Sequence, residues 1–158
     1  MGIYRSLKRF LSSLKSCRKK YMGCSNLIQQ EEKAVFIFEK CSYEELQAIQ
    51  HREDLLLSGW TLLEKEYIDV TEKVYAEDGT MVALINYYFL NENKDRMMIA
   101  LFEVFKPYRD RGLGKRIIAQ FLQDYYGEVN LEPSGEQSES FWKQCGFECG
   151  CYLDRRCK

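Results

Sequence analysis

Long apolar runs and histidine are both scarce in this sequence. No window approaches about 18 consecutive apolar residues, so we expect no membrane-spanning helix. Arg, Lys and Ser interrupt every apolar run of the first segment, which argues against a secretory signal. The only histidine, His51, falls on a predicted helix away from every motif, so we expect no Ser/His or Cys/His nucleophile.

Cysteine pairs with the spacing of a zinc site are also missing. The chain has 158 residues and seven cysteines, an odd number, and it is long enough to bury a core without disulfides. We therefore expect reduced thiols and a cytoplasmic protein. Cys145, Cys149, Cys151 and Cys157 contain no C-x2-C pair, so we expect no metal site.

Acidic residues are absent from residues 1–24, which hold seven of the 23 basic residues. The rest of the chain carries 16 basic and 24 acidic residues, so the body is acidic. A nucleic-acid role for the whole body is therefore not expected, although the basic segment alone could contact a polyanion.

Apolar side chains recur at three- and four-residue steps in residues 1–24, which predicts a basic amphipathic N-terminal helix. Three interpretations stay open: an accessory helix packed on the body, a helix on a membrane surface, or an upstream extension if translation begins at Met22. A further hypothesis gives residues 1–22 a weak docking role at RNA or at an anionic membrane.

Alternating strand and helix patterns make up the rest of the chain. A capping box begins a helix at Ser42, and Asp78-Gly79 is typical of a hairpin turn. Residues 60–70 are ambiguous between a helix and a strand. Strands are predicted at 34–39, 73–77, 81–90, 97–105, 129–131 and 147–153, and further helices at 112–126 and 138–144. This order predicts an α/β fold, a mixed sheet with helices on its faces.

The clearest chemical signal follows the strand predicted at 97–105. That strand stops at Pro107, and an Arg-x-x-Gly-x-Gly run then opens a helix. Gly112 and Gly114 allow a ligand to approach the backbone, where the unpaired N–H groups and the positive end of the helix dipole face it. These features predict a pyrophosphate site. The basic side chains around it are Arg109, Arg111 and Lys115.

Two segments together resemble a known family. Residues 98–118 resemble the central acyl-CoA-binding motif of the GNAT N-acetyltransferases, Arg/Gln-x-x-Gly-x-Gly/Ala after the fourth strand. Residues 141–147, Phe-Trp-Lys-Gln-Cys-Gly-Phe, resemble the second motif of that family. The match covers residues 34–153 and implies a single GNAT-like domain with a mixed, mostly antiparallel sheet flanked by helices. It also implies acetyl-CoA as the co-substrate and acetyl transfer to a primary amine by direct attack.

The resemblance implies where the cofactor binds. The pantetheine arm would pair with the main chain of 103–105, between two strands that splay apart, and the pyrophosphate would lie on the N–H groups of 109–114. The cofactor-binding residues implied are Val104, Phe105, Arg109, Asp110, Arg111, Gly112, Leu113, Gly114 and Lys115.

Glu103 is the candidate general base, because it is the one ionisable group in an otherwise apolar strand beside the expected thioester. Burial would raise its pKa toward the useful range. The alternative is that Glu103 points outward at the sheet edge, or pairs with Arg109 or Lys106. Backbone N–H groups at 104–105 are the candidate oxyanion donors.

The sequence departs from the family pattern in its last part. Trp142 stands where members often have a tyrosine that protonates the leaving thiolate, and an indole is too weak an acid. The alternatives are Tyr152, Tyr108 or water. Gly135, Glu136 and Gln137 replace a usual asparagine, and the C-terminal hairpin is short.

Two function hypotheses follow. The first is an N-acetyltransferase acting on an amine of a small molecule or a protein, and the second is a degenerate module that binds acyl-CoA or a protein without turnover. The shortened sheet edge also favours a homodimer.

Overall fold

A computed structural model describes residues 35–63, 65, 70–148 and 152–154, and all of them belong to one compact unit, residues 34–158. The amphipathic helix predicted in residues 1–24 lies outside the described residues, as do Cys149, Cys151 and Cys157. Among the described helices, none is long and apolar enough to cross a membrane.

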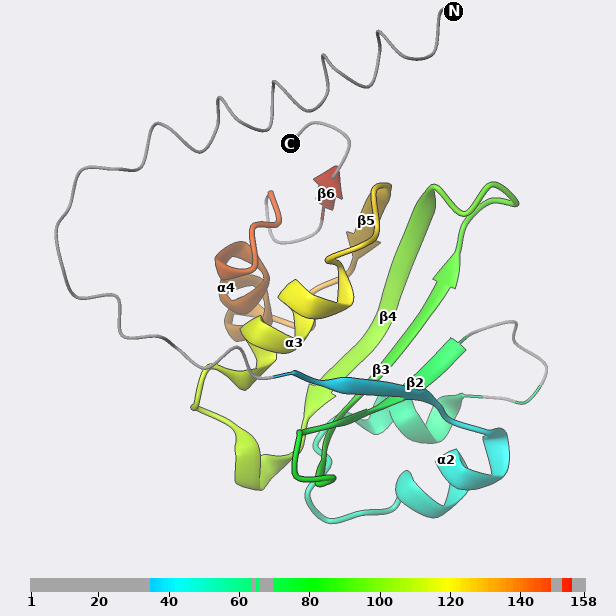
Figure 1. Ribbon diagram of the computed structural model, residues 1–158, viewed down its shortest axis with the longest axis vertical. Helices are drawn as coiled ribbons and strands as arrows, with labels where there is room; N and C mark the ends of the chain where they lie inside the picture. Colours follow the sequence, from blue (N-terminus) through cyan, green and yellow to red (C-terminus); the bar gives the residue numbers. More distant parts are fainter. Residues whose placement is uncertain (1–34, 64, 66–69, 149–151, 155–158) are drawn as a thin grey trace, which may run out of the picture. The chain divides into compact units, whose positions relative to one another are not determined.

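The sheet of the described residues has its strands side by side in chain order (Figure 1). They are β1 (Ile37–Lys40), β2 (Val70–Tyr75), β3 (Met81–Phe89), β4 (Arg96–Val104), β5 (Glu128–Leu131) and β6 (Tyr152–Asp154). Neighbouring strands are antiparallel except β4 and β5, which are parallel. The predicted mixed, mostly antiparallel sheet is confirmed.

Two local motifs form as the sequence predicts. The side chains and backbones of Ser42 and Glu45 exchange the hydrogen bonds of a capping box, at 2.8 and 3.1 Å, and begin α2 (Tyr43–Ile49). The tight turn between β2 and β3 contains Gly79 at φ +81°, and Asp78 Oδ1 accepts a hydrogen bond from the Thr80 N–H at 2.9 Å.

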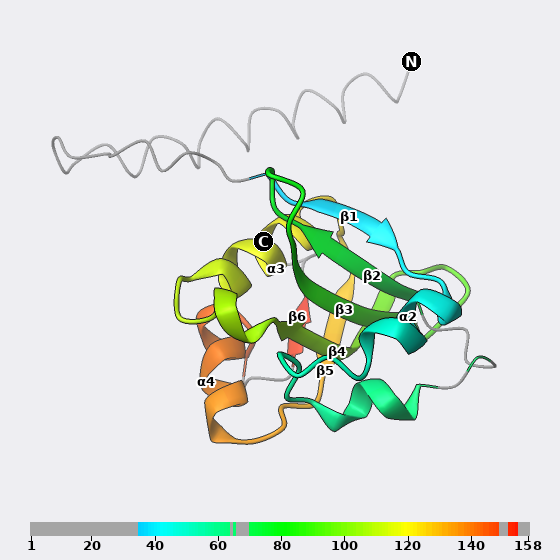
Figure 2. The ribbon, with the colours of Figure 1, turned by 90° about the horizontal axis from the view of Figure 1, so that it is seen from below.

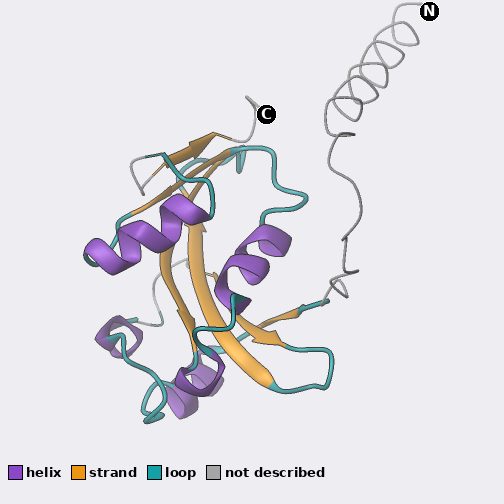
Figure 3. Ribbon diagram, turned by 90° about the vertical axis from the view of Figure 1, so that its left-hand side faces the viewer, coloured by secondary structure: helices purple, strands orange, loops and turns teal. Residues whose placement is uncertain are grey.

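Helices cover both faces of the sheet (Figures 2 and 3). One face packs against α3 (Leu113–Phe121) and α4 (Glu136–Gln144), which bury Ile117, Ile118 and Trp142 against β3, β4 and β5. The other face packs against α2 and the 3-10 helix η2 (Ser58–Leu62), in a second core cluster. The buried residues of that cluster are Leu46, Trp60, Leu84 and Phe105.

Some element boundaries differ from the predictions. The ambiguous stretch 60–70 divides, since η2 ends at Leu62 and β2 begins at Val70. Helix α3 ends at Phe121 rather than at 126, because the following N–H groups bond three residues back: Gln123 to Gln120 at 3.0 Å and Tyr125 to Leu122 at 3.2 Å. Of the strand predicted at 147–153, the described residues include β6 at Tyr152–Asp154, whereas residue 147 is not in a strand.

Candidate functional site

Strand β4 opens away from β5 halfway along its length. The parallel pairing runs from Arg96–Glu128 to Ile99–Leu131, and the described residues give no further pair beyond it. At the same point β4 contains a bulge, since Asn86 and Tyr87 of β3 face Leu101 and Ile99, which leaves Ala100 as the extra residue. The half of β4 after the bulge therefore keeps a free edge on the β5 side.

The alternating direction of backbone groups along a strand determines which N–H and C=O groups of β4 lie at this free edge. The Phe105 N–H donates to the Val82 carbonyl of β3 at 2.9 Å. Because neighbouring residues of a strand direct their N–H and C=O groups to opposite sides, those of Val104 and Phe102 face the β5 side. Phe105 is buried, and its N–H is already bonded to β3. This N–H therefore cannot serve as the predicted oxyanion donor.

The turn after β4 shapes the predicted pyrophosphate site. A short 3-10 helix, η3 (Lys106–Tyr108), is followed by two residues in the left-handed region, Asp110 at φ +61° and Gly112 at φ +69°. Gly112 is the N-cap of α3, and only glycine adopts this conformation without strain. Since the first N–H groups of a helix have no partner within it, those of residues 113–115 point out of α3 beside the positive end of its dipole.

Gly114 has a different role from Gly112. A Cβ at position 114 would lie 3.0 and 3.3 Å from ring carbons of Phe141 and 3.5 Å from Val104 Cγ2, whereas one at position 112 would meet no atom within 4 Å. The glycine at 114 thus allows α3, α4 and β4 to pack closely, and the glycine at 112 allows the turn. The sequence alone suggested ligand approach as the reason for both.

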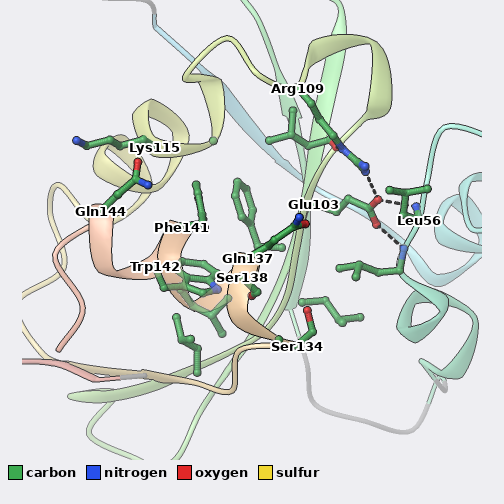
Figure 4. A pocket seen from close by; sticks show the side chains of 18 of the residues that line it. Leu56, Glu103, Arg109, Lys115, Ser134, Gln137, Ser138, Phe141, Trp142 and Gln144 are labelled. Atoms are coloured by element: carbon green, nitrogen blue, oxygen red, sulfur yellow. Dashed lines mark hydrogen bonds and ion pairs between the residues drawn. The ribbon is translucent and has the colours of Figure 1, made fainter. Parts of the chain in front are cut away.

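A cavity of about 990 Å³ lies over these elements (Figure 4). It is lined by residues 99–104 of β4, by residues 108–110 and 112–115, and by the segment 134–138 at the start of α4. The predicted cofactor residues Val104, Arg109, Asp110, Gly112, Leu113, Gly114 and Lys115 line it, and Phe105 and Arg111 do not.

Glu103 lies at the edge of this cavity and is 5 % exposed. Its carboxylate accepts hydrogen bonds from the Leu56 and Leu57 N–H groups at 2.6 and 3.1 Å and forms an ion pair with the Arg109 guanidinium (Figure 4). It also accepts a hydrogen bond from the Trp60 indole at 2.8 Å. These bonds anchor the loop before η2 to β4, and they offset the free-energy cost of burying the charged carboxylate.

The Arg109 side chain turns inward from the turn between β4 and α3. Its Nε donates to the Val104 carbonyl at 2.7 Å, its Nη2 pairs with Glu103, and its backbone N–H donates to the Lys106 carbonyl at 3.4 Å. These contacts tie the turn to the end of β4. The pairing with Glu103 corresponds to one of the alternatives considered for that carboxylate.

The loop before η2 also bonds directly to the turn between β4 and α3. The Lys106 N–H donates to the Asp54 carbonyl at 3.0 Å, and the guanidinium of Arg52 lies 4.4 Å from the centroid of the Phe105 ring. Arg52 also donates to the Asp54 carboxylate at 2.8 and 2.6 Å. This hydrogen bonding holds the pKa of Asp54 below its usual 3.8.

Aromatic rings form one wall of the cavity. Trp142 lies in α4 with its ring centroid 5.0 Å from Phe141, 5.2 Å from Phe147 and 5.9 Å from Phe102 of β4. The second family motif therefore contributes packing that holds α4 against β4, and Trp142 is buried within it. Behind the wall, burial raises the pKa of the Cys145 thiol to about 11, while nearby Lys115 lowers it less. A thiol with this pKa is a poor nucleophile.

The candidate acids occupy different positions. Tyr108 lines the cavity. The backbone of Tyr152 lies in β6, opposite Asn130 of β5, and its side chain lies outside the described part of the chain.

Several lining residues were not predicted. Leu56 and Leu57 act through backbone N–H groups, which carry no residue-type signal, and they are 46 or more residues from Glu103 in the chain. Ser134 and Ser138 line the cavity together with Gln137. The glycine and polar residues at the start of α4 are visible in the sequence, where they stand out only as a departure from the family pattern.

Comparison with known proteins agrees with this geometry. The sequence profile of the Acetyltransferase (GNAT) family matches residues 27–147. No curated protein sequence matches the chain.

Solved structures of the same fold share little sequence with this chain. AtaTR bound with AcCoA has a TM-score of 0.58 at 10% identity, over 77% of this chain and 94% of that chain. The Bacillus subtilis protein YycN has a TM-score of 0.56 at 15% identity, and the match covers 72% of this chain and 92% of that chain. An acetyltransferase from Thermus thermophilus has a TM-score of 0.53 at 12% identity, and the match covers 72% of this chain and 87% of that chain. The family match and the shared fold agree, and the chain belongs to the GNAT acetyltransferase family, whose co-substrate is acetyl-CoA.

Proposed function

We propose that this protein is an N-acetyltransferase that moves the acetyl group of acetyl-CoA to a primary amine by direct attack. The observation that carries the proposal is the continuous cavity that joins the N-terminus of α3 to the free edge of β4. These are the two features that the cofactor needs, donors for a pyrophosphate and an unpaired strand edge for an extended amide-containing arm.

The proposed cofactor position follows from the backbone. The N–H groups of residues 113–115 hold the pyrophosphate, with Lys115 adding positive charge at the cavity wall. The pantetheine arm runs along β4 past the Val104 N–H and the backbone groups of Phe102, while the Val104 carbonyl already accepts from Arg109 Nε at 2.7 Å. The thioester then lies toward the bulge at Ala100, and the Phe102 N–H replaces that of Phe105 as the candidate oxyanion donor.

The proposed reaction needs one base and one acid. The acceptor ammonium loses a proton, and the neutral nitrogen attacks the thioester carbonyl to form a tetrahedral intermediate. As the C–S bond breaks, the positively charged nitrogen loses a second proton and the leaving thiolate takes one up, so that the products are a neutral amide and the CoA thiol. Glu103 remains the proposed base, acting through water. Its hydrogen bonds from the Leu56 and Leu57 N–H groups also make it a positioning residue for the loop before η2. We propose that the acceptor binds on this side of the sheet. Tyr108 and Tyr152 remain the proposed acids, since Trp142 cannot serve.

The acceptor and other partners are proposals of the same kind. The acceptor is an amine on a small molecule or a protein. Contact of residues 1–22 with RNA or an anionic membrane, and pairing of two copies through a sheet edge, remain predictions. Cys41 and Cys145 are free thiols, which supports a cytoplasmic location.

A matched amine screen tests the proposal. The protein is incubated with acetyl-CoA and a panel of primary amines, each paired with its N,N-dimethyl analogue, and the released CoA thiol is measured. We expect thiol release with at least one primary amine and none with its dimethyl analogue, because a tertiary amine cannot give a neutral amide. Binding of acetyl-CoA without release for any amine would contradict the enzyme proposal and favour a binding module.

The kinetic pattern tests direct attack. A ternary complex predicts intersecting lines when both substrates are varied, and no acetylated protein by mass spectrometry. Parallel lines together with an acetylated protein would contradict direct attack and indicate a covalent intermediate.

A further inference from the structure

A second cavity, of about 550 Å³, lies at the opposite end of α3 from the first. The first cavity is lined by residues 112–115 at the start of α3, and the second by residues 120, 121 and 123–125 at and beyond its end. Strands β1 to β4 provide its other wall. None of the residues that line it takes part in the proposed acetyl transfer.

Aromatic rings dominate the lining of this second cavity. They come from Phe38, Tyr87, Phe89, Phe121 and Tyr125, all of them half-buried. Tyr87 is central: its ring centroid lies 5.1 Å from that of Phe121 and 5.9 Å from that of Phe89, in edge-on arrangements. The ring centroids of Phe38 and Phe121 lie 5.8 Å apart. The face of an aromatic ring carries negative potential and attracts a cation, so a cavity lined by several rings suits one.

The charges of the cavity have the same sign. Glu72 and Asp124 line it, and none of its lining residues, all within the described part of the chain, is a lysine, arginine or histidine. The Tyr87 hydroxyl donates to Glu72 Oε1 at 3.0 Å and holds that carboxylate at the rings. Burial, together with Glu72, raises the pKa of Tyr87, so the hydroxyl remains a donor. The negative end of the α3 dipole adds to this potential.

One ammonium group of the chain already lies beside this cluster. Lys94, in the turn between β3 and β4, places its Nζ 5.6 Å from the centroid of the Phe89 ring. Lys94 does not line the cavity. A lysine ammonium group thus already lies near one ring of this cluster, without lining the cavity.

We propose that this second cavity is a binding site for a primary alkylammonium ion, distinct from the acetyl-CoA site. The rings of Tyr87, Phe89 and Phe121 enclose its alkyl chain and positive charge, and the carboxylates of Glu72 and Asp124 accept its N–H groups. A quaternary ammonium ion fits the rings but donates nothing to the carboxylates, so it binds more weakly. The same chemistry belongs to a free diamine and to a lysine side chain.

Calorimetry with the full chain and no acetyl-CoA tests this site. The probes are 1,4-diaminobutane, Nα-acetyl-lysine amide, tetramethylammonium and butan-1-ol. We expect saturable binding of the first two, weaker binding of tetramethylammonium and none of the alcohol. The tighter of the first two identifies the source of the ammonium group, a free diamine or a lysine side chain.

Three variants localise the binding. Glu72→Gln should weaken diamine binding by about tenfold or more, whereas Glu77→Gln, with the same charge change in the exposed β2–β3 turn, should leave it unchanged. Lys94→Asn removes the neighbouring positive charge, so it should tighten diamine binding a few-fold. Asparagine tolerates the left-handed conformation of residue 94, at φ +56°, so this substitution should not strain the turn.

Two results would overturn the site. The first is no saturable diamine binding by folded wild type. The second is equal affinities of the wild type, Glu72→Gln and Lys94→Asn proteins, which would place the diamine elsewhere. Neither result depends on acetyl transfer, because no variant lies in the first cavity and no acetyl-CoA is present.

Discussion

At the scale of single residues, Glu103 connects the two sides of the sheet. Its carboxylate is buried on β4 and binds the loop before η2 together with Arg109 of the turn between β4 and α3. A buried carboxylate with this set of donors stabilises the fold, and the proposed reaction also requires it as a base. The two roles make different predictions.

Glu103→Gln should lower both stability and turnover. The amide keeps one acceptor but turns an NH2 group toward existing donors, so the free energy of unfolding should fall by about 2 kcal/mol or more. Loss of a base should lower kcat by about 100-fold or more. Urea unfolding and CoA release measure the two effects.

Trp60→Phe is the matched control for Glu103→Gln. It removes one donor and leaves the carboxylate, so it should reduce stability and keep most of kcat. If Trp60→Phe lowers kcat as much as Glu103→Gln does, Glu103 acts by positioning and is not the base.

The sequence predicted some of these residues and missed others for a physical reason. Gly112 was predicted from the Gly-x-Gly run as a point of ligand approach, and the structure adds a second reason for glycine there, a left-handed N-cap. Arg109 was among the partners considered for Glu103, but its backbone partners could not be predicted, because the N–H groups of Leu56 and Leu57 look like any others. The N–H direction of Phe105 depends on the register of β3 and β4, which no local pattern specifies.

At the scale of elements, the contact between α3 and α4 shapes the first cavity. Gly114 of α3 lies against Phe141 of α4, and a Cβ there would press on the Phe141 ring at 3.0 and 3.3 Å. Since Phe141 also lines the cavity, the packing of these helices and the shape of the cofactor site are coupled.

Gly114→Ala should therefore be destabilising and should weaken acetyl-CoA binding. Overpacking of this size lowers the free energy of unfolding by about 1–3 kcal/mol. Adding Phe141→Leu should restore part of the loss, giving a favourable coupling energy relative to the two single variants. Thermal unfolding and calorimetry measure the two effects, and independent effects of the two substitutions would contradict the close contact.

Most elements could be predicted, and their limits could not. The Asp78-Gly79 turn and the capping box at Ser42 are local signals, and both formed as expected. The stretch 60–70 was ambiguous because it divides between a short 3-10 helix and the start of a strand, neither long enough to show a period.

At the scale of the whole molecule, carboxylates paired with basic residues make stability depend on pH. A hydrogen bond from Arg52 lowers the pKa of Asp54, and one from Lys73 lowers the pKa of Glu45. Each depressed carboxylate contributes stability above its unfolded pKa, near 3.8 for Asp and 4.5 for Glu, and loses it as pH falls through the folded pKa.

The melting temperature should thus fall as the pH drops below about 4, by a modest amount because Glu45 is exposed and Asp54 is only half-buried. Asp54→Asn should make the melting temperature depend less on pH in this acid range, because the neutral amide has no pKa to shift. Glu77→Gln serves as the control for the change in net charge. Melting curves across the acid range test this. Superimposable wild-type and Asp54→Asn profiles would contradict the role of the Arg52–Asp54 pair.

The central claim is that the turn before α3 and the free edge of β4 bind acetyl-CoA. The matched pair Gly112→Glu and Gly79→Glu tests it most directly. Both glycines have positive φ, +69° and +81°, and a Cβ at either position would meet no atom within 4 Å, so both substitutions impose similar strain. Of the two, residue 112 lines the cavity and residue 79 does not.

The measurement is acetyl-CoA binding by calorimetry for wild type and both variants. We predict saturable binding by wild type and Gly79→Glu, and a loss of about 100-fold or more for Gly112→Glu, because a negative side chain meets the pyrophosphate. No binding by folded wild type, or equal binding by all three proteins, would contradict the account.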